Sequence, residues 1–376
     1  MRKVIGIYYN AEFTEKSFET GCGGSDTWVI QIAKEFTRQN YHVIVFCDCK
    51  DWVITTNGVE YVPIEYFERR CEYQHFDYFI LTRLINEHIY NTVVETGCKN
   101  IYIQSHDMFI WHNELYDECY IYNPEKYPYL KYIALTDFHK WELNEYNKIP
   151  YGKIEVIGNG IDSDIFDNVD EFNPIKDNSI LFPTVYSRGG GILVENILPK
   201  VIKSIPDFKV NLCGYSQNFP EHVRNNPNVN ILGMLSKKDY YKEFMKHKVW
   251  FLPCVVPEDF GLCACEAAMC GCEIVSPFEH GMKDVCYPFV NLAMKNKFKV
   301  KDTGWYHYSR YELDMDEKTF ENTCQEAADM IIDSINNYYF PNRVRLRESF
   351  KNFIIKTHTW KNVVDKWKKL FESGHK

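Results

Sequence analysis

Long apolar runs and an excess of basic residues are lacking in this sequence, and no N-terminal leader is predicted. No hydrophobic stretch approaches the roughly 18 residues that would indicate a membrane span, so no transmembrane segment is predicted. The start Met1-Arg2-Lys3 is followed by only a short apolar run, so no signal peptide is predicted either. The 43 Lys and Arg are outnumbered by 52 Asp and Glu, for a net charge of -9. That balance argues against a general nucleic-acid-binding protein, whose affinity would come from basic patches.

Hydrophobic residues and cysteines, by contrast, are plentiful. The 376 residues are 45% hydrophobic, and this length predicts two domains. Without a predicted signal peptide the 14 cysteines are expected to be reduced thiols, which places the protein in the cytoplasm. Cys263, Cys265, Cys270 and Cys272 are close enough in sequence to suggest zinc. Residues two apart on a helix point about 200° apart, so buried thiols are favoured and no metal is expected.

Runs of β-branched and aromatic residues alternate with helical patterns in both halves of the chain. The parallel strands expected in the first half are residues 4–9, 42–47, 78–81, 101–104, 132–135 and 154–157. Those expected in the second half are residues 179–182, 209–214, 229–233, 249–253 and 273–276. Helices are expected at residues 27–37, 193–204 and 237–246. Two such arrays predict an α/β protein with two Rossmann-like, doubly wound domains that face a cleft.

A polar segment at residues 168–178, which includes Pro174, separates the two arrays and is the predicted hinge. The first domain is therefore predicted at residues 1–170 and the second at residues 171–350. Near the end of the chain, Trp360 and Trp367 belong to an apolar stripe at helical spacing. Residues 351–376 are predicted to form a C-terminal helix that docks through this stripe.

The most informative segment begins at Glu258, contains a Phe-Gly pair and continues into small residues typical of a helix. Phe260, Gly261 and Leu262 are expected in the first helical turn, where backbone N–H groups lack partners and attract phosphate. Glu258 lies before this turn and Glu266 lies inside the helix, so two carboxylates flank the anion site and can bind sugar hydroxyls. These features suggest a sugar nucleotide as the ligand. The plainer alternative is acids that complement the helix dipole or the surface, for about 0.3–1 kcal/mol each.

The spacing of Glu258 and Glu266, with seven residues between them, resembles the nucleotide-sugar motif of glycosyltransferase family 4. Residues 157–166 resemble that family's N-G-I-D-x-x-x-F turn. The resemblance implies the GT-B fold, with the C-terminal helix crossing back to the first domain. It also implies a retaining hexosyltransferase that moves a sugar from a UDP- or GDP-linked donor to a hydroxyl acceptor, without a cofactor. The acceptor would be a glycan, a lipid or a small molecule, and the resemblance leaves peripheral membrane contact open.

Two glycine-rich loops are further candidates for donor binding. Arg188 is followed by three glycines and could grip a diphosphate through charge-assisted bonds of about 1.5–3 kcal/mol each. An arginine in a flexible turn is the alternative, but the resemblance places the family's phosphate-binding arginine here. The lysine that usually follows is lacking, because the next basic residue is Lys200. Gly23 and Gly24 precede the first helix, and the resemblance implies that their loop lies beneath the donor. Asp26 stands where a dinucleotide fingerprint has its last glycine.

His106 follows an expected strand of the first half, and the neighbouring Asp107 could fix its tautomer. A lone histidine is more often structural, but the resemblance implies that His106 contacts the transferred sugar. By the same resemblance Gly214 lines the base pocket. Asp162 and Asp164 could be read as a metal-binding D-x-D pair. Their place in the N-G-I-D turn favours a structural role instead.

On this interpretation Arg188 and the amides of residues 260–262 stabilise the leaving diphosphate. Glu266 binds the ribose, while Glu258 and His106 orient the sugar. No side chain presents itself as a covalent nucleophile, which agrees with the same-face mechanism proposed for the family. The alternatives are a nucleotide-sugar epimerase of the same fold and a non-catalytic nucleotide-sugar-binding protein.

Overall fold

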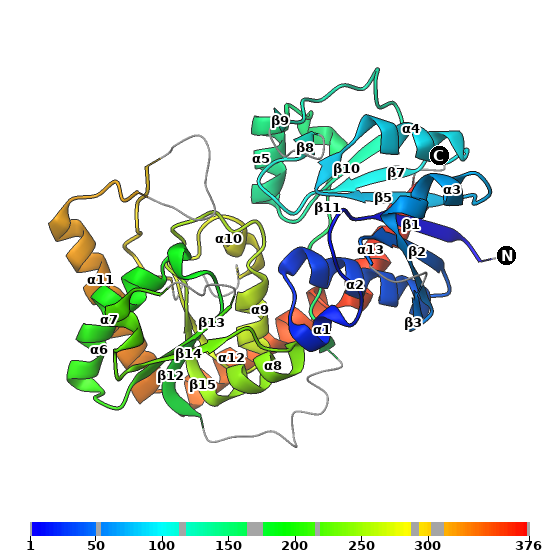
Figure 1. Cartoon of the computed structure of the whole chain (residues 1–376). Coiled ribbons are helices and arrows are strands. Elements are labelled where there is room, and N and C mark those ends of the chain that lie inside the picture. Colours follow the sequence, from blue (N-terminus) through cyan, green and yellow to red (C-terminus); the bar gives the residue numbers. More distant parts are fainter. Residues whose placement is uncertain are drawn as a thin grey trace. The chain divides into compact units, whose positions relative to one another are not determined.

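The computed structural model describes residues 2–49, 54–112, 118–163, 176–214, 219–286, 293–301 and 312–373. The chain divides into two compact units (Figure 1). Unit 1 comprises Met1–Ser17, Cys22–Asp162 and His358–Lys376, and unit 2 comprises Phe18–Gly21 and Ser163–Thr357. Most of the predicted hinge, including residue 170, lies outside the described residues, so a boundary at that position stays a prediction.

The main sheet of unit 1 has eight strands: β1 (Val4–Tyr8), β2 (His42–Cys47), β3 (Ile54–Thr56), β4 (Val59–Pro63), β5 (Tyr78–Thr82), β7 (Ile101–Gln104), β10 (Leu130–Ala134) and β11 (Ile154–Val156). Their order is β11-β10-β7-β5-β1-β2-β4-β3, and all neighbours are parallel except the β3–β4 hairpin. The strands predicted in the first half are present, with ends within two residues of the prediction. The central strands β1, β5 and β7 are buried on both faces, as the continuous apolar runs of a parallel sheet require, whereas the edge strand β11 exposes Glu155.

The helices in the first half of the chain are α1 (Ser17–Thr20), α2 (Gly24–Arg38), α3 (Phe67–Cys71), α4 (Glu87–Glu95) and α5 (Asp137–Asn147), and α1 lies mostly in unit 2. A second, small sheet contains β6 (Leu84–Ile85), β8 (Trp111–His112) and β9 (Glu118–Cys119). α2 begins three residues before the predicted start, because the Asp26 carboxylate accepts the N–H of Gly23 at 2.8 Å and stabilises the first turn. Asn86 and Thr136 cap α4 and α5 through their side chains.

The last helix, α13 (Trp360–Ser373), packs against α2 in unit 1 (red and blue in Figure 1). Trp367 is fully buried, with its ring 5.4 Å from the ring of Tyr102. Phe371 stacks on Tyr78 with the ring centroids 3.9 Å apart. The apolar stripe seen in the sequence is therefore the face that docks.

Unit 2 is built on β12 (Asp177–Phe182), β13 (Lys209–Cys213), β14 (Val229–Gly233), β15 (His247–Phe251) and β16 (Glu273–Val275). All neighbours are parallel, in the order β14-β13-β12-β15-β16. The helices are α6 (Leu198–Ser204), α7 (Glu221–Arg224), α8 (Lys237–Lys246), α9 (Leu262–Met269), α10 (Gly281–Val285), α11 (Glu317–Asn336) and α12 (Pro341–Thr357). A π-helical segment, Ile192–Ile197, leads into α6. The predicted segment 351–376 is divided, because α12 ends at Thr357 in unit 2 and α13 begins at Trp360 in unit 1.

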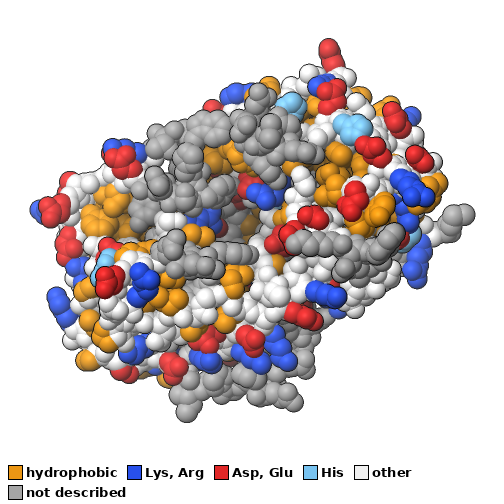
Figure 2. Space-filling model, viewed as in Figure 1, with side chains coloured by type: hydrophobic (Ala, Val, Ile, Leu, Met, Phe, Trp, Pro, Cys, Tyr) orange, Lys and Arg blue, Asp and Glu red, His pale blue; other side chains and the backbone are white. Residues whose placement is uncertain are grey.

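The surface of the described residues carries charges of both signs. Acidic and basic side chains are interspersed over the face drawn in Figure 2. In the described part of the chain, no helix is long and apolar enough to cross a membrane.

Candidate functional site

The predicted donor-binding residues of unit 2 lie in loops that follow its parallel strands. Arg188 comes after β12, Gly214 directly after β13, and Glu258 after β15. The loop at residues 276–280 follows β16. Because the carboxyl ends of parallel strands meet at one edge of a sheet, these loops share that edge, where ligands of open α/β sheets bind.

The turn from Glu258 into α9 depends on two glycines. Gly261 has φ 83°, and a Cβ there would lie 2.5 Å from Cγ of Met282. Gly281 donates its N–H to the Glu258 carbonyl at 2.8 Å, and a Cβ on Gly281 would overlap the carbonyl of Asp259. Gly281, the first residue of α10, therefore packs directly against the turn, and only glycine permits this contact.

The start of α9 differs from the prediction. Gly261 is the N-cap and Leu262 the first helical residue, so Phe260 and Gly261 precede the helix instead of belonging to its first turn. Phe260 is also buried, at 3% exposure. At the start of α9 the N–H groups of Gly261, Leu262 and Cys263 have no partner among the described residues, and Leu262 and Cys263 are half-buried. The predicted anion cradle is thus shifted toward the helix by one residue.

Strained backbone surrounds this turn. Cys254, Phe278 and His280 have φ of 54°, 47° and 57°, a region that residues other than glycine rarely adopt. The hydroxyl of Ser276 connects two of them, since it lies 3.3 Å from Sγ of Cys254 and accepts the N–H of Phe278 at 3.2 Å. Such residues cost about 1–3 kcal/mol each and cluster at ligand sites. Their concentration beside Glu258 favours a functional role for this edge.

Arg188 and Glu258 form an ion pair. Nη1 of Arg188 donates to Oε1 of Glu258 at 3.2 Å, and the two side chains are 21% and 24% exposed. Burial raises the pKa of Glu258, while the Arg188 guanidinium lowers it. After Arg188 the chain turns at Gly189, with φ 108°, where a Cβ would overlap the ring of Pro253. The structure thus brings together two residues that lie 70 positions apart in the sequence.

Glu266 is enclosed by three donors. Its Oε1 accepts from Nζ of Lys237 at 2.5 Å and from the Tyr241 hydroxyl at 2.8 Å. Its Oε2 accepts from the Tyr240 hydroxyl at 2.9 Å, and the side chain is only 3% exposed. Lys237, Tyr240 and Tyr241 were not predicted as site residues. Their spacing places them on one face of α8, but nothing in the sequence indicates that this face meets Glu266.

In unit 1, His106 follows β7 and its ring centroid lies 5.0 Å from that of Trp28. Its Nε2 is buried without a hydrogen-bond partner among the described residues. Burial lowers the pKa of His106 to about 3, so the imidazole is neutral at physiological pH. A neutral imidazole whose Nε2 has no protein partner can bond a ligand hydroxyl.

That Asp107 fixes the tautomer of His106 stays a prediction. The Asp107 carboxylate accepts from Nε of Arg83 at 2.9 Å and from Nε1 of Trp111 at 3.3 Å. The backbone carbonyl of Asp107 lies 2.8 Å from Nε2 of the buried His139. Asp107 therefore stabilises the loop that carries His106, and its charge raises the pKa of the imidazole against the effect of burial.

The other predicted positions have simpler surroundings. Gly23 precedes α2 and Gly24 begins it, and a Cβ at Gly24 would meet nothing within 4 Å, so no packing constraint requires glycine there. Gly214 has φ 139°. Asp162 accepts a bond from Gln31 at 2.9 Å, while Asp164 lies outside the described residues.

The four clustered cysteines contact different groups. Cys263 lies 3.7 Å from the hydroxyl of Tyr240, whereas Cys272 donates to the carbonyl of His247 at 3.3 Å. Within the described ranges no three His, Cys, Asp or Glu side chains are arranged to hold a metal ion.

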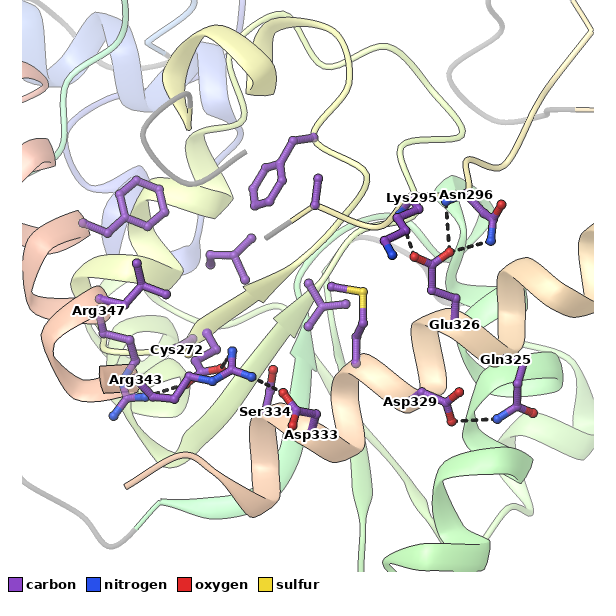
Figure 3. A pocket seen from close by; sticks show the side chains of 18 of the residues that line it. Cys272, Lys295, Asn296, Gln325, Glu326, Asp329, Asp333, Ser334, Arg343 and Arg347 are labelled. Carbon is purple, nitrogen blue, oxygen red and sulfur yellow. Dashed lines mark hydrogen bonds and ion pairs between the residues drawn. The ribbon is translucent and has the colours of Figure 1, made fainter. Parts of the chain in front are cut away.

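A cavity of about 710 Å³ lies elsewhere in unit 2, beside β16, α11 and α12 (Figure 3). None of the predicted site residues lines it. Glu273 accepts there from Nη1 of Arg343 at 3.2 Å and from Nη1 of Arg347 at 2.6 Å, and Figure 3 shows Arg343 facing Asp333. Burial raises the pKa of Glu273 and the two arginines lower it. These charges pair with one another and connect α12 to β16.

Three solved structures share this fold over nearly the whole chain. A glycosyltransferase from Rickettsia africae is 15% identical, with a TM-score of 0.66. Its superposition covers 99% of this chain and 98% of the glycosyltransferase chain. Sucrose-phosphate synthase from Thermosynechococcus elongatus is 13% identical, with a TM-score of 0.63 and 99% coverage of both chains. HepE from Anabaena, in complex with UDP and glucose, is 13% identical, with a TM-score of 0.61, and covers 99% of this chain and 100% of that chain.

Neither the protein-family models nor the curated proteins gave a match to this sequence. At identities this low the structural similarity shows the fold alone. The predicted α/β fold class is confirmed, and the chain has the GT-B fold of these glycosyltransferases.

Proposed function

We propose that this protein is a retaining glycosyltransferase that moves a hexose from a nucleoside diphosphate sugar to a hydroxyl acceptor. The observation that carries the proposal is the Arg188–Glu258 pair, which lies at the strand-end edge of a GT-B unit next to the start of α9. The likeness to HepE, whose structure contains UDP and glucose, supports a nucleotide-sugar donor. Retention is supported by the spacing of Glu258 and Glu266, which resembles that of retaining enzymes.

The leaving diphosphate would be stabilised by the Arg188 guanidinium and the N–H groups of Leu262 and Cys263, which act where negative charge develops. Glu258 and the neutral His106 would bind hydroxyls of the transferred sugar and fix its orientation. Glu266 would accept one ribose hydroxyl through the lone pair of Oε2 that the Tyr240 bond leaves. No metal takes part in the proposed reaction, in which these donors stabilise charge that develops on the leaving group.

The acceptor is proposed to be a glycan or a lipid-linked sugar in the cytoplasm. All 14 cysteines are unpaired thiols, which supports a reducing compartment. Glycolipid acceptors would bring the protein to a membrane surface, where it would make peripheral contact.

Thermal unfolding with UDP, GDP, ADP and NAD, each with and without EDTA, tests the donor site. A ligand at 100 times its dissociation constant adds about 2.7 kcal/mol to the free energy of unfolding. We expect one nucleoside diphosphate to stabilise the protein, and EDTA to leave that effect unchanged. Stabilisation by NAD alone, or by none of the four, would contradict the proposal.

Turnover separates the remaining alternatives. The sugar form of the nucleotide that binds is then incubated with and without a panel of glycan acceptors, and the products are analysed by mass. Transfer only with an acceptor supports a glycosyltransferase. An altered nucleotide sugar formed without an acceptor identifies an epimerase, and binding without any product identifies a non-catalytic protein.

A further inference from the structure

One cation, Arg188, was predicted from the sequence for the diphosphate of the proposed donor site. A diphosphate carries several negative charges, and Arg188 already shares its charge with Glu258. The next basic residue in the sequence, Lys200, does not contribute, because its ammonium pairs with Glu321. A nucleoside diphosphate at this site would be bound more tightly with a second cation supplied by another element.

Lys237, the first residue of α8, has the required position and surroundings. Its ammonium lies 2.5 Å from Oε1 of Glu266 and 5.1 and 5.0 Å from the ring centroids of Tyr240 and Tyr241. A carboxylate and two aromatic faces therefore hold the charge in place. The side chain is 17% exposed and covers Glu266, which is 3% exposed. The group that solvent can reach here is therefore the ammonium of Lys237, whereas the sequence predicted the carboxylate of Glu266.

This ammonium is close to the start of α9. Glu266 lies one turn, about 6 Å, after Leu262 along the helix axis, and helical side chains lean toward the N-terminus. The Tyr240 hydroxyl confirms the placement, because it bonds Glu266 at 2.9 Å and Cys263 at 3.7 Å. The pKa of Cys263 responds to the same groups: burial, Glu266 and Glu258 raise it and Tyr240 and Lys237 lower it, for a value of about 12.

We propose that Lys237 is the second diphosphate-binding cation of the donor site, supplied by α8 in place of a lysine after Arg188. The inference rests on the proposed function. Lys237 and the free N–H groups of Leu262 and Cys263 then meet the phosphates together, with the macrodipole of α9 adding to their charge. Glu266 holds the ammonium over the first helical turn, in addition to accepting a ribose hydroxyl.

The competing role for Lys237 is to neutralise a buried carboxylate and nothing more. The two roles differ in the part of the nucleotide that senses the lysine. A phosphate-binding lysine matters more as phosphates are added to the nucleoside. A lysine that acts only through Glu266 affects the ribose, and so affects nucleoside, monophosphate and diphosphate equally.

The experiment is a series of dissociation constants by calorimetry for uridine, UMP and UDP, with the guanosine and adenosine series measured alongside. The variants are Lys237→Met and, as a matched control, Lys238→Met, which removes the exposed neighbouring charge. For the nucleotide that the wild type binds most tightly, we expect Lys237→Met to weaken the diphosphate about tenfold or more. The monophosphate should be weakened less, the nucleoside less than about twofold, and Lys238→Met should change none of them.

Equal weakening of all three ligands by Lys237→Met, or no difference from Lys238→Met, would overturn the inference and leave the proposed function standing. If the wild type binds no nucleoside diphosphate, the proposed donor site itself is wrong, and the inference fails with it. Lys237→Met leaves a buried carboxylate unpaired, which can prevent folding. The double variant Lys237→Met/Glu266→Gln removes both charges and gives the same three-ligand comparison, with Glu266→Gln alone as its reference.

Discussion

Glu258 and Glu266 belong to one sequence motif but have different surroundings in the folded chain. Glu258 is about a quarter exposed and shares a hydrogen bond with Arg188, so a ligand can reach it. Glu266 is almost sealed by Lys237 and two tyrosines. The left-handed turn at Gly261 separates the two acids and directs them to different neighbours. The two acids are therefore proposed to have different roles, Glu258 toward the sugar and Glu266 toward a lysine and the ribose.

Replacing Arg188 by methionine should reduce turnover at least about tenfold, the usual scale for loss of a group that stabilises developing charge. The physical reason is that the leaving diphosphate loses its guanidinium partner. Steady-state kinetics with a nucleotide sugar and acceptor measure the effect, and the exposed Arg224→Met is the matched control. Because Arg188→Met also leaves Glu258 unpaired, the double variant Arg188→Met/Glu258→Gln is measured beside it. Near-normal turnover in both would remove Arg188 from the proposed mechanism.

Part of the proposed site follows from a local motif. Glu258, Gly261 and Arg188 were assigned to it from their sequence neighbourhoods, and the structure places Arg188 against Glu258. Contacts across the fold could not be found in this way. Asp107 was assigned to His106 beside it, yet its partner Arg83 lies 24 positions away, and Lys237 lies 29 positions from Glu266.

At the scale of elements, the strands were predictable because each is a short buried run between polar turns. The β3–β4 hairpin was missed although it carries a recognisable signal, the pair Asn57-Gly58 with φ of 50° and 78°. The start of α9 could not be predicted, since Gly261 takes its conformation where Met282 and Gly281 pack against the turn. The two-residue strands of the small sheet have no periodicity to detect.

The docking of α13 yields a prediction at this scale. Trp367 is fully buried among Trp28, Phe36 and Tyr102. Trp367→Ala should reduce the free energy of unfolding by about 3–5 kcal/mol, from lost burial and the cavity left behind. Trp367→Phe keeps most of the apolar volume, and the indole N–H it removes has no partner in the described structure, so it should cost much less. Urea unfolding followed by circular dichroism measures both, and similar values for the two variants would show that α13 adapts around the site.

Across the whole molecule, charged side chains lie on the surface, and histidines inside the protein are kept neutral by burial. Ionised side chains of both signs share the surface, whereas His106 and His358 are held neutral inside unit 1. Burial lowers the pKa of His358 to about 4 and that of His106 to about 3, from an ordinary value of 6.5. The unfolded chain therefore binds protons at these histidines at a pH where the folded chain does not.

Stability should consequently fall as the pH is lowered through 6.5. A histidine whose pKa is lower in the folded chain contributes its full stabilisation at pH values above the pKa of the unfolded chain. For His358 this stabilisation is lost as the pH falls from 6.5 toward about 4. Between pH 7.5 and 5 His106 and His358 should each cost about 2 kcal/mol of the free energy of unfolding. Burial also lowers the pKa of His247 and His280, which add to the loss. Urea unfolding at both pH values should show the loss smaller by about 2 kcal/mol in His358→Gln. The exposed His75→Gln should leave the loss unchanged, and an equal loss in wild type and His358→Gln would show that protons bind at other groups.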